Sequence, residues 1–229
     1  MVDAVLLEWE GVLADSGAAR RESLRHALVA EGVTAHALDD EDGCAGLDTS
    51  AAARAVLARA GRDGDPTLAE LIAVRAGRAF AERLAQGFTM QAGATAFVAA
   101  AEARSRLALT TRATRAETEI FLRLSGLETA FSHVVTAEDV LHLPPSPELF
   151  DQAYSSLARR RPTRRERTVA LVDSAAAIRA GRSAGIHVLA VGVPAHVALE
   201  ADGSVDGLDD LTLAQAAALA GVTPTGRPA

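Results

Sequence analysis

Six residues could do chemistry in this chain, because each lies at or just after the end of an apolar run. They are Glu8, Glu10, Thr111, Arg112, Asp173 and Ser174. Carboxylates can act as nucleophiles or as general acids and bases, and several of them close together can hold a hard cation such as Mg²⁺. Hydroxyl and guanidinium groups can bind an oxyanion. The spacing raises the question whether Glu8 and Glu10, two carboxylates one residue apart, form a catalytic pair.

A parallel β-sheet would bring these residues together. Short apolar runs, typical of strands buried on both faces, alternate with Ala- and Leu-rich segments of helical spacing. The runs are DAVLLE at 3–8, RLALTT at 106–111, TVALVD at 168–173 and HVLAVG at 187–192, with a weaker SHVVT at 132–136. This alternation predicts a doubly wound α/β fold with helices on both faces of the sheet. In such sheets ligands bind beyond the carboxyl ends of the strands, which is where the six residues fall.

Local signals mark where several of the helices begin and end. Thr114 and Glu117 have the spacing of a capping box, and Ser146 before Pro147 predicts an N-cap followed by proline at the first helical position. Gly126 falls where the helix after the second strand should end.

The segment after the first strand breaks the alternation. Residues 17–89 are rich in Ala, Leu, Arg and Glu at helical period, with interruptions rich in Gly and Asp at 39–48 and 61–66. We therefore expect a helical domain at 17–89, inserted into an α/β domain made of residues 1–16 and 90–229.

Composition argues against several classes of partner. A net charge of -7 and a pI near 5.4 do not suit a nucleic-acid-binding protein. The run RRRPTRRER at 159–167 is a local exception, and we expect a solvated loop there. Cys44 is the only cysteine, so no disulfide can form within the chain. No run approaches the roughly 20 apolar residues that span a bilayer, and we expect a cytoplasmic protein with no membrane partner.

Four motifs in order resemble those of the haloacid dehalogenase-like superfamily of phosphohydrolases. The family pattern D-x-D-G-V-L-x-D-S corresponds to EWEGVLADS at 8–16, and its Thr or Ser closing an apolar strand corresponds to Thr111. Its K-P-x-P-E-x-F corresponds to PPSPELF at 144–150, and its acidic strand end corresponds to Asp173 in VDSAAAIRAGRSAG. The chain is most similar to the phosphoglycolate phosphatase and β-phosphoglucomutase branch, whose helical cap follows the first strand.

The resemblance implies a role for each matching position. Glu8 stands at the nucleophile and Glu10 at the general acid and base, while Thr111 and the lysine position, here Pro144, would neutralise phosphate oxygens. It implies Mg²⁺ held by Glu8, the backbone carbonyl of Glu10 and Asp173, and a small phosphorylated molecule as substrate. We add Arg112 and Ser174 as residues that could bind the phosphate. The sequence does not specify an oligomeric state.

Three departures from the pattern weaken the expected chemistry. Glu in place of Asp at positions 8 and 10 moves each carboxylate by the length of a methylene, and misplacement near ~1 Å can cost on the order of 100-fold in rate. Pro144 removes a cation of a kind worth roughly 100- to 1000-fold. Two hypotheses follow: a catalytically impaired binding protein with weak or no Mg²⁺ binding, or an active Mg²⁺-dependent hydrolase of small phosphorylated metabolites.

Overall fold

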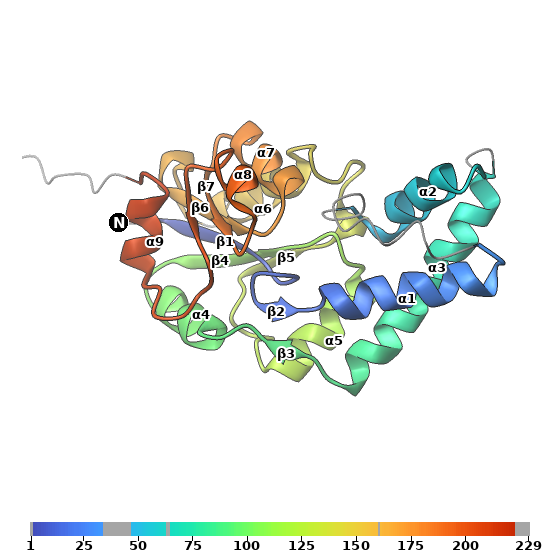
Figure 1. The fold of residues 1–229 in the computed structure, drawn as a ribbon. Helices are drawn as coiled ribbons and strands as arrows, with labels where there is room; N and C mark the ends of the chain where they lie inside the picture. The colour runs from blue at the N-terminus through green and yellow to red at the C-terminus, as the bar shows by residue number, and fades with distance from the viewer. Residues whose placement is uncertain (1, 34–46, 63–64, 160, 223–229) are drawn as a thin grey trace, which may run out of the picture. The chain divides into compact units, whose positions relative to one another are not determined.

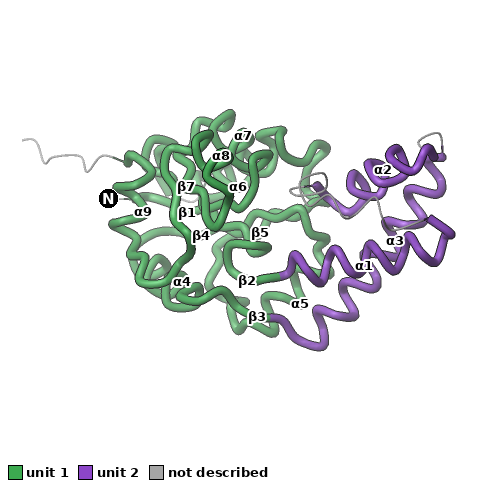
Figure 2. The backbone as a smooth tube through the Cα atoms, viewed as in Figure 1, with its two compact units in different colours: residues 1–15, 89–229 green, residues 16–88 purple. Residues whose placement is uncertain are grey.

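The computed structural model describes residues 2–33, 47–62, 65–159 and 161–222. Cys44, and most of the Gly- and Asp-rich interruption at 39–48, lie outside the described residues. The chain forms two compact units, one made of residues 1–15 and 89–229 and the other of residues 16–88 (Figure 2). We describe each unit by itself.

The first unit is built on a six-stranded parallel sheet with strand order β5-β4-β1-β6-β7-β8. Its strands are β1 (Ala4–Glu8), β4 (Arg106–Thr110), β5 (His133–Val135), β6 (Thr168–Val172), β7 (His187–Val191) and β8 (Gly203–Val205). The central strand β1 is buried along its whole length, as its unbroken apolar run requires. The doubly wound α/β fold predicted from the sequence is confirmed.

Helices cover both faces of this sheet (Figure 1). The helices of the unit are α4 (Ala94–Glu102), α5 (Arg115–Ser125), α6 (Glu148–Ala158), α7 (Ala175–Ser183), α8 (Ala195–Ala198) and α9 (Leu213–Leu219). On one face α6 and α7 bury Phe150 and Ile178 against Leu6 of the central strand. On the other face α5 carries Phe121, whose ring stacks on Trp9 at 4.7 Å between centroids and 14° between planes. Trp9 is fully buried.

The helix ends follow the local signals with one correction. Thr114 and Glu117 form a capping box at the start of α5, and Gly126 ends that helix at φ +70°. Ser146 was expected as the N-cap of α6, but the N-cap is Pro147 and the helix begins at Glu148. Ser146 Oγ still accepts from the Glu148 backbone N–H at 3.4 Å. The hydroxyl therefore satisfies a backbone donor of the first helical turn from the residue before the N-cap.

The two segments that connect the units form a small antiparallel β-ribbon. β2 (Ala14–Asp15) pairs with β3 (Thr89–Met90) in the register Ala14 to Met90 and Asp15 to Thr89. The Gln91 backbone N–H donates to Leu13 O at 2.8 Å and continues the ladder by one bond. The insert therefore leaves and rejoins the sheet unit at neighbouring points.

The second unit is helical within its described residues. It contains α1 (Gly17–Ala30), α2 (Thr49–Arg59) and α3 (Pro66–Gln86), which pack around buried Leu28, Val56 and Ile72. Asp48 and Asp65 cap α2 and α3 by accepting from backbone N–H groups at 2.9 Å. The guanidinium of Arg20 lies over the ring of Phe80 at 3.9 Å, which joins α1 to α3.

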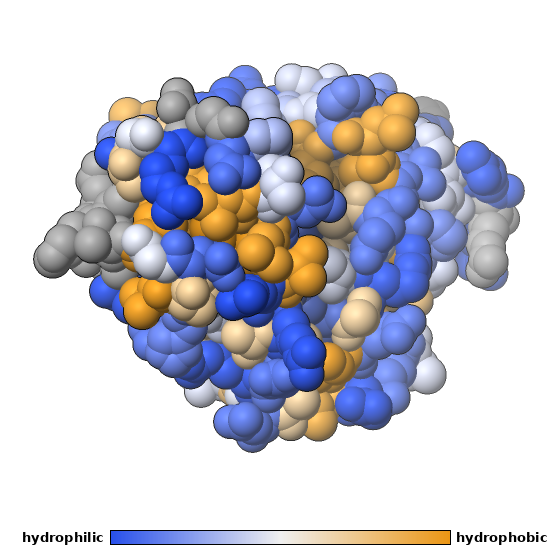
Figure 3. Space-filling model, turned by 90° about the vertical axis from the view of Figure 1, so that its right-hand side faces the viewer, coloured by the Kyte–Doolittle hydropathy of each residue, from blue (hydrophilic) through white to orange (hydrophobic). Residues whose placement is uncertain are grey.

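Figure 3 shows one face of the molecule, where apolar side chains gather in patches among hydrophilic ones. Large apolar side chains with at least 60% of their area exposed are Val29, Val74, Leu141 and Leu199. Among the described helices, none has the length and apolar character that crossing a bilayer requires.

Candidate active site at the carboxyl ends of the strands

The carboxyl ends of β1, β4 and β6 bring the predicted residues together. Glu8 is the last residue of β1 and lies in register with Thr110 of β4, while Asp173 directly follows β6 on the other side. The Asp173 backbone N–H donates to Glu8 Oε2 at 3.2 Å. This edge of the sheet is where a doubly wound fold places its ligands.

The next residues along the first two motifs meet at the same edge. Thr111 Oγ1 donates to Glu10 Oε2 at 3.5 Å and accepts from the Ala113 backbone N–H at 2.9 Å. Arg112 Nη2 lies 3.7 Å from Asp173 Oδ1, and the Arg112 side chain is only 11% exposed. The Arg112 guanidinium therefore lies beside the Asp173 carboxylate, and its charge also acts on Glu8.

A tight loop after β1 fixes how close the chain comes to Asp173. The backbone N–H groups of Leu13 and Ala14 both donate to Trp9 O, and that of Gly11 donates to Ala14 O at 2.9 Å. Gly11 has φ +73°, and a Cβ atom there would lie 1.8 Å from Asp173 Oδ2. Only glycine fits this position, because the left-handed backbone and the carboxylate both exclude a side chain.

Burial and like charge change the protonation of the two central carboxylates. Glu8 is 3% exposed, and desolvation together with the charge of Asp173 raises its pKa to about 8. Burial also raises the pKa of Asp173, with Glu10 adding to the rise and Arg112 opposing it. This setting favours the protonated form of Glu8, and a neutral carboxylic acid is a poor nucleophile.

The last two predicted residues have other settings. Ser174 is the N-cap of α7, and its Oγ accepts from the Ala177 backbone N–H at 3.3 Å. Pro144 lies in the loop before α6 and offers no cation and no backbone N–H donor.

Glu148, which the sequence reasoning did not single out, organises the loop that contains Pro144. It accepts from the backbone N–H groups of Leu141 and His142 at 2.9 and 3.0 Å, and it pairs with His142 Nδ1 at 2.5 Å. The hydrogen bonds from His142 lower the pKa of the Glu148 carboxyl. Its place as the only acid in the third motif was the signal that could have identified it.

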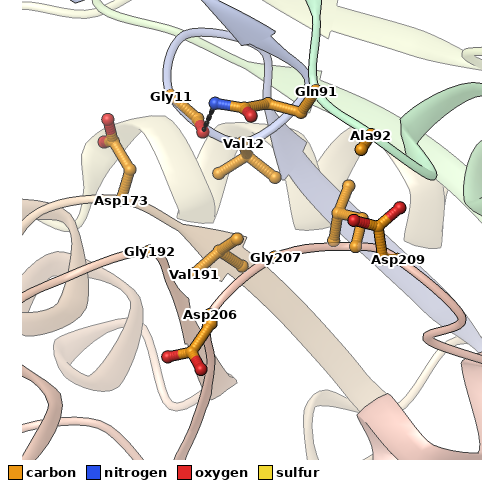
Figure 4. Close-up of a pocket in the computed structure, with 11 residues that line it drawn as sticks. Gly11, Val12, Gln91, Ala92, Asp173, Val191, Gly192, Asp206, Gly207 and Asp209 are labelled. Atoms are coloured by element: carbon orange, nitrogen blue, oxygen red, sulfur yellow. Dashed lines mark hydrogen bonds between the residues drawn. The ribbon is translucent and has the colours of Figure 1, made fainter.

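A cavity of about 330 Å³ opens beside Asp173 within the sheet unit. Figure 4 shows the Gln91 side chain reaching Gly11, where its Nε2 donates to Gly11 O at 3.2 Å. The ends of β7 and β8 contribute further lining residues, including Asp206 and Asp209. Sequence reasoning missed these residues, because neither the loop after β8 nor Gln91 lies in one of the four motifs.

The comparisons with known proteins agree with this arrangement. The family model for haloacid dehalogenase-like hydrolases matches residues 5–191. The chain belongs to this family. No curated protein matches the sequence.

Solved structures of this haloacid dehalogenase-like fold match almost the whole chain. CbbY from Rhodobacter sphaeroides in complex with phosphate is 24% identical, with a TM-score of 0.77 over 94% of this chain and 99% of that one. β-Phosphoglucomutase from Clostridium difficile is 15% identical, with a TM-score of 0.77 over 93% and 95%. A CbbY mutant in complex with xylulose-1,5-bisphosphate is 23% identical, with a TM-score of 0.73 over 94% and 99%. At these identities the likeness establishes the fold.

Haloacid dehalogenase-like phosphatases typically use Mg²⁺, and the donors at this edge are of a type that suits it. Glu8, Asp173 and the backbone carbonyl of Glu10 offer oxygen atoms, which Mg²⁺ prefers. Asp173 Oδ1 is buried and accepts no hydrogen bond from the described residues. The repulsion that raises the pKa of Glu8 would be relieved by a cation. Against this, the described residues hold no cluster of three His, Cys, Asp or Glu side chains placed to bind a metal.

Proposed function

We propose that this haloacid dehalogenase-like protein binds a small phosphorylated molecule at the edge formed by Glu8, Thr111, Arg112 and Asp173, and that it hydrolyses this molecule poorly or not at all. The observation that supports this most is the state of Glu8, at the nucleophile position. Its carboxyl is buried, accepts from the Asp173 N–H, and has a pKa of about 8. A nucleophile would instead need to be ionised and directed at phosphorus.

The proposed binding site keeps the groups that hold an oxyanion. Thr111 can offer its hydroxyl and Arg112 its guanidinium, and Ser174 lies at the N-terminus of α7, where backbone N–H groups favour an anion. Arg112 would supply part of the positive charge that Pro144 lacks. The printed names of the CbbY structures, one with phosphate and one with xylulose-1,5-bisphosphate, support a phosphorylated small molecule as the ligand class.

Mg²⁺ would be held by Glu8, the Glu10 carbonyl and Asp173, and it would supply charge neutralisation for a phosphate group. Binding requires ionised carboxylates, so it competes with the proton on Glu8. We propose for this reason that Mg²⁺ binds weakly near neutral pH. We also propose that the helical unit of residues 16–88 is the cap domain of this family.

An active hydrolase is the second candidate, and one observation favours it. Glu10, Thr111, Arg112 and Asp173 remain gathered beside Glu8, so a bound cation could favour the ionised form of Glu8 and allow attack. In this case Glu10 would act as the general acid and base.

A ligand panel with two readouts separates the candidates. The purified chain with Mg²⁺ is mixed with phosphomonoesters and bisphosphates, and thermal shift and phosphate release are measured on the same samples. We expect stabilisation by one or more compounds, with release far below the 1 to 1000 per second of ordinary enzymes. The Glu8→Gln variant tests the nucleophile position, because it mimics the protonated acid: its residual release should equal that of the parent. Ordinary turnover that Glu8→Gln abolishes would establish the hydrolase instead.

A further inference from the structure

A second cavity, of about 310 Å³, lies at the amino ends of β4 and β5, on the opposite side of the sheet unit from the strand ends that carry the candidate active site. Its lining residues are Arg106, Ser132, Ser156, Leu157 and Arg161. Arg106 is the first residue of β4, and Ser132 immediately precedes β5. Because these strands run parallel to β1, their first residues lie at the end of the sheet remote from Glu8 and Thr110. The cavity is therefore separate from the candidate active site.

Two arginines face this cavity without a carboxylate to neutralise them. Arg106 donates from Nη1 to Leu157 O and from Nη2 to Arg161 O at 3.3 Å. Carbonyl oxygens orient a guanidinium but leave its charge in place. Within the described residues, neither Arg106 nor Arg161 forms an ion pair with a carboxylate. The acid that acts on Arg106 from nearby, Asp3, is already paired with Arg167 at 3.7 Å.

Partial burial, and then the charge of Arg161, lower the pKa of Arg106. A protein that holds two guanidinium groups close together bears a repulsive cost unless an anion lies between them. Arg106 is also held in place, since the backbone carbonyls of Leu157 and Arg161 fix its head group. The fixed guanidinium of Arg106, the more exposed one of Arg161 and two serine hydroxyls provide hydrogen-bond donors for a tetrahedral oxyanion.

Arg165 and Arg167, which lie in the same largely exposed loop, have other partners. Arg165 pairs with Asp151 at 2.8 Å and lies over the Tyr154 ring at 4.2 Å. Arg167 pairs with Asp3. Arg161 lines the cavity, whereas Arg159 is exposed and does not line it. The run therefore offers a matched pair of positions, one inside the site and one outside it.

We propose that this cavity binds the phosphate group of a small molecule, or inorganic phosphate, between Arg106 and Arg161 with Ser132 and Ser156 as further donors. The volume of about 310 Å³ is roughly ten times the ~30 Å³ that one water molecule occupies in the liquid. It therefore holds a phosphate group with a short organic part attached. The site is separate from the candidate active site, because none of its lining residues belongs to the four motifs of the family.

The test is a titration of the full chain with inorganic phosphate at constant ionic strength. Binding is monitored by ¹H–¹⁵N correlation spectra recorded at each phosphate concentration. We expect saturable shifts of the Ser132, Ser156 and Arg161 amides. Arg161→Gln should raise the Kd at these amides at least ~10-fold, because it removes a charge-assisted contact from an exposed position that folding does not require. Arg159→Gln removes the same charge outside the cavity and should change the Kd less than about twofold.

Parallel titrations with glycerol 3-phosphate distinguish a phosphate ester from free phosphate as the preferred ligand. The amides of Ala113 and Asp173 report independently on the candidate active site. Shifts confined to the amides of Ser132, Ser156 and Arg161 therefore support the second cavity as a phosphate site, even if phosphate does not bind at the candidate active site. Absence of saturable shifts at the three amides would overturn the proposal. So would equal weakening by Arg159→Gln and Arg161→Gln, which would indicate general attraction of anions, or of an acidic macromolecule, to the run.

Discussion

The Asp173 backbone N–H donates to Glu8 Oε2 at 3.2 Å, joining the last residue of β1 to the first residue beyond β6. This contact holds the Glu8 carboxyl against the neighbouring strand end. Burial, and then the charge of the neighbouring Asp173 carboxyl, raise the pKa of Glu8 to about 8, although this hydrogen bond acts in the opposite direction. The raised pKa leads to a prediction about stability.

The free energy of unfolding should fall as the pH rises from 4.5 to about 8 in metal-free buffer. The folded state binds the Glu8 proton more tightly than the unfolded state, so the contribution of Glu8 is complete below pH 4.5 and is lost through pH 8. The raised pKa of Asp173 acts in the same direction. Asp139, whose pKa is lowered, loses its contribution only at pH values below its ordinary 3.8, outside this window.

Urea unfolding at pH 5, 6, 7 and 8 measures this slope, which for one group is at most about 1.4 kcal/mol per pH unit. Glu8→Gln should flatten it, since the variant carries no proton to lose. A parent protein whose stability is constant or rises across the window would show that Glu8 is ionised when folded.

Gly11→Ala should destabilise the sheet unit more than Gly126→Ala does. Both glycines have similar φ values, +73° and +70°, so both substitutions carry the left-handed penalty of about 1–2 kcal/mol. A Cβ at position 126 meets nothing within 4 Å, whereas at position 11 it would lie 1.8 Å from Asp173 Oδ2. The difference between the two losses, measured by urea unfolding, isolates the contact with Asp173. Equal losses would mean that Asp173 moves away at no cost.

Repair of the three diverged positions should restore phosphatase activity. Glu8→Asp or Glu10→Asp alone should restore little, because the other groups remain misplaced or missing. The combination Glu8→Asp, Glu10→Asp and Pro144→Lys should release phosphate from a small ester with Mg²⁺ at a rate at least ~100-fold above the parent, since catalytic groups act as a unit. Adding Asp173→Asn should abolish the gain. A folded triple variant as inactive as the parent would show that the site has diverged at further positions.

The stack between Trp9 and Phe121 should contribute measurably to the stability of the fold. Phe121→Leu removes a ring that stacks at 4.7 Å, while Phe97→Leu removes a buried ring that makes no ring contact among the described residues. We expect Phe121→Leu to cost about 0.5–1.5 kcal/mol more than Phe97→Leu. Trp9 is the single tryptophan, so its fluorescence follows unfolding in both variants. Equal costs would assign the effect to burial alone.

The sequence predicted the parts of the fold that local pattern determines. Apolar runs identified β1, β4, β6 and β7, because strands buried on both faces must be apolar throughout. β8 was missed, since Gly203–Val205 is a three-residue edge strand with an exposed serine at its centre. An edge strand of this kind carries no periodic signal.

The candidate site, too, could be predicted only in part. Strand ends and motif spacing brought Glu8, Thr111 and Asp173 to one edge of the sheet, as the structure has them. The contact of Glu8 with the Asp173 N–H could not be predicted, because a side-chain rotamer depends on neighbours from another strand. The cavity at Arg106 and Arg161 was out of reach for a similar reason: it forms only where the chain after α6 returns to the start of β4.

The β2–β3 ribbon makes the helical unit a removable module. Paired Cα atoms in an antiparallel ladder lie about 5 Å apart, so Asp15 and Thr89 are close enough to be joined directly. Replacing residues 16–88 with a two-residue Asn-Gly turn would convert the two connecting segments into one β-hairpin and leave the strand order of the sheet unchanged. Inserts of other lengths and folds can enter at the same point, so this part of the chain can be exchanged without rebuilding the sheet.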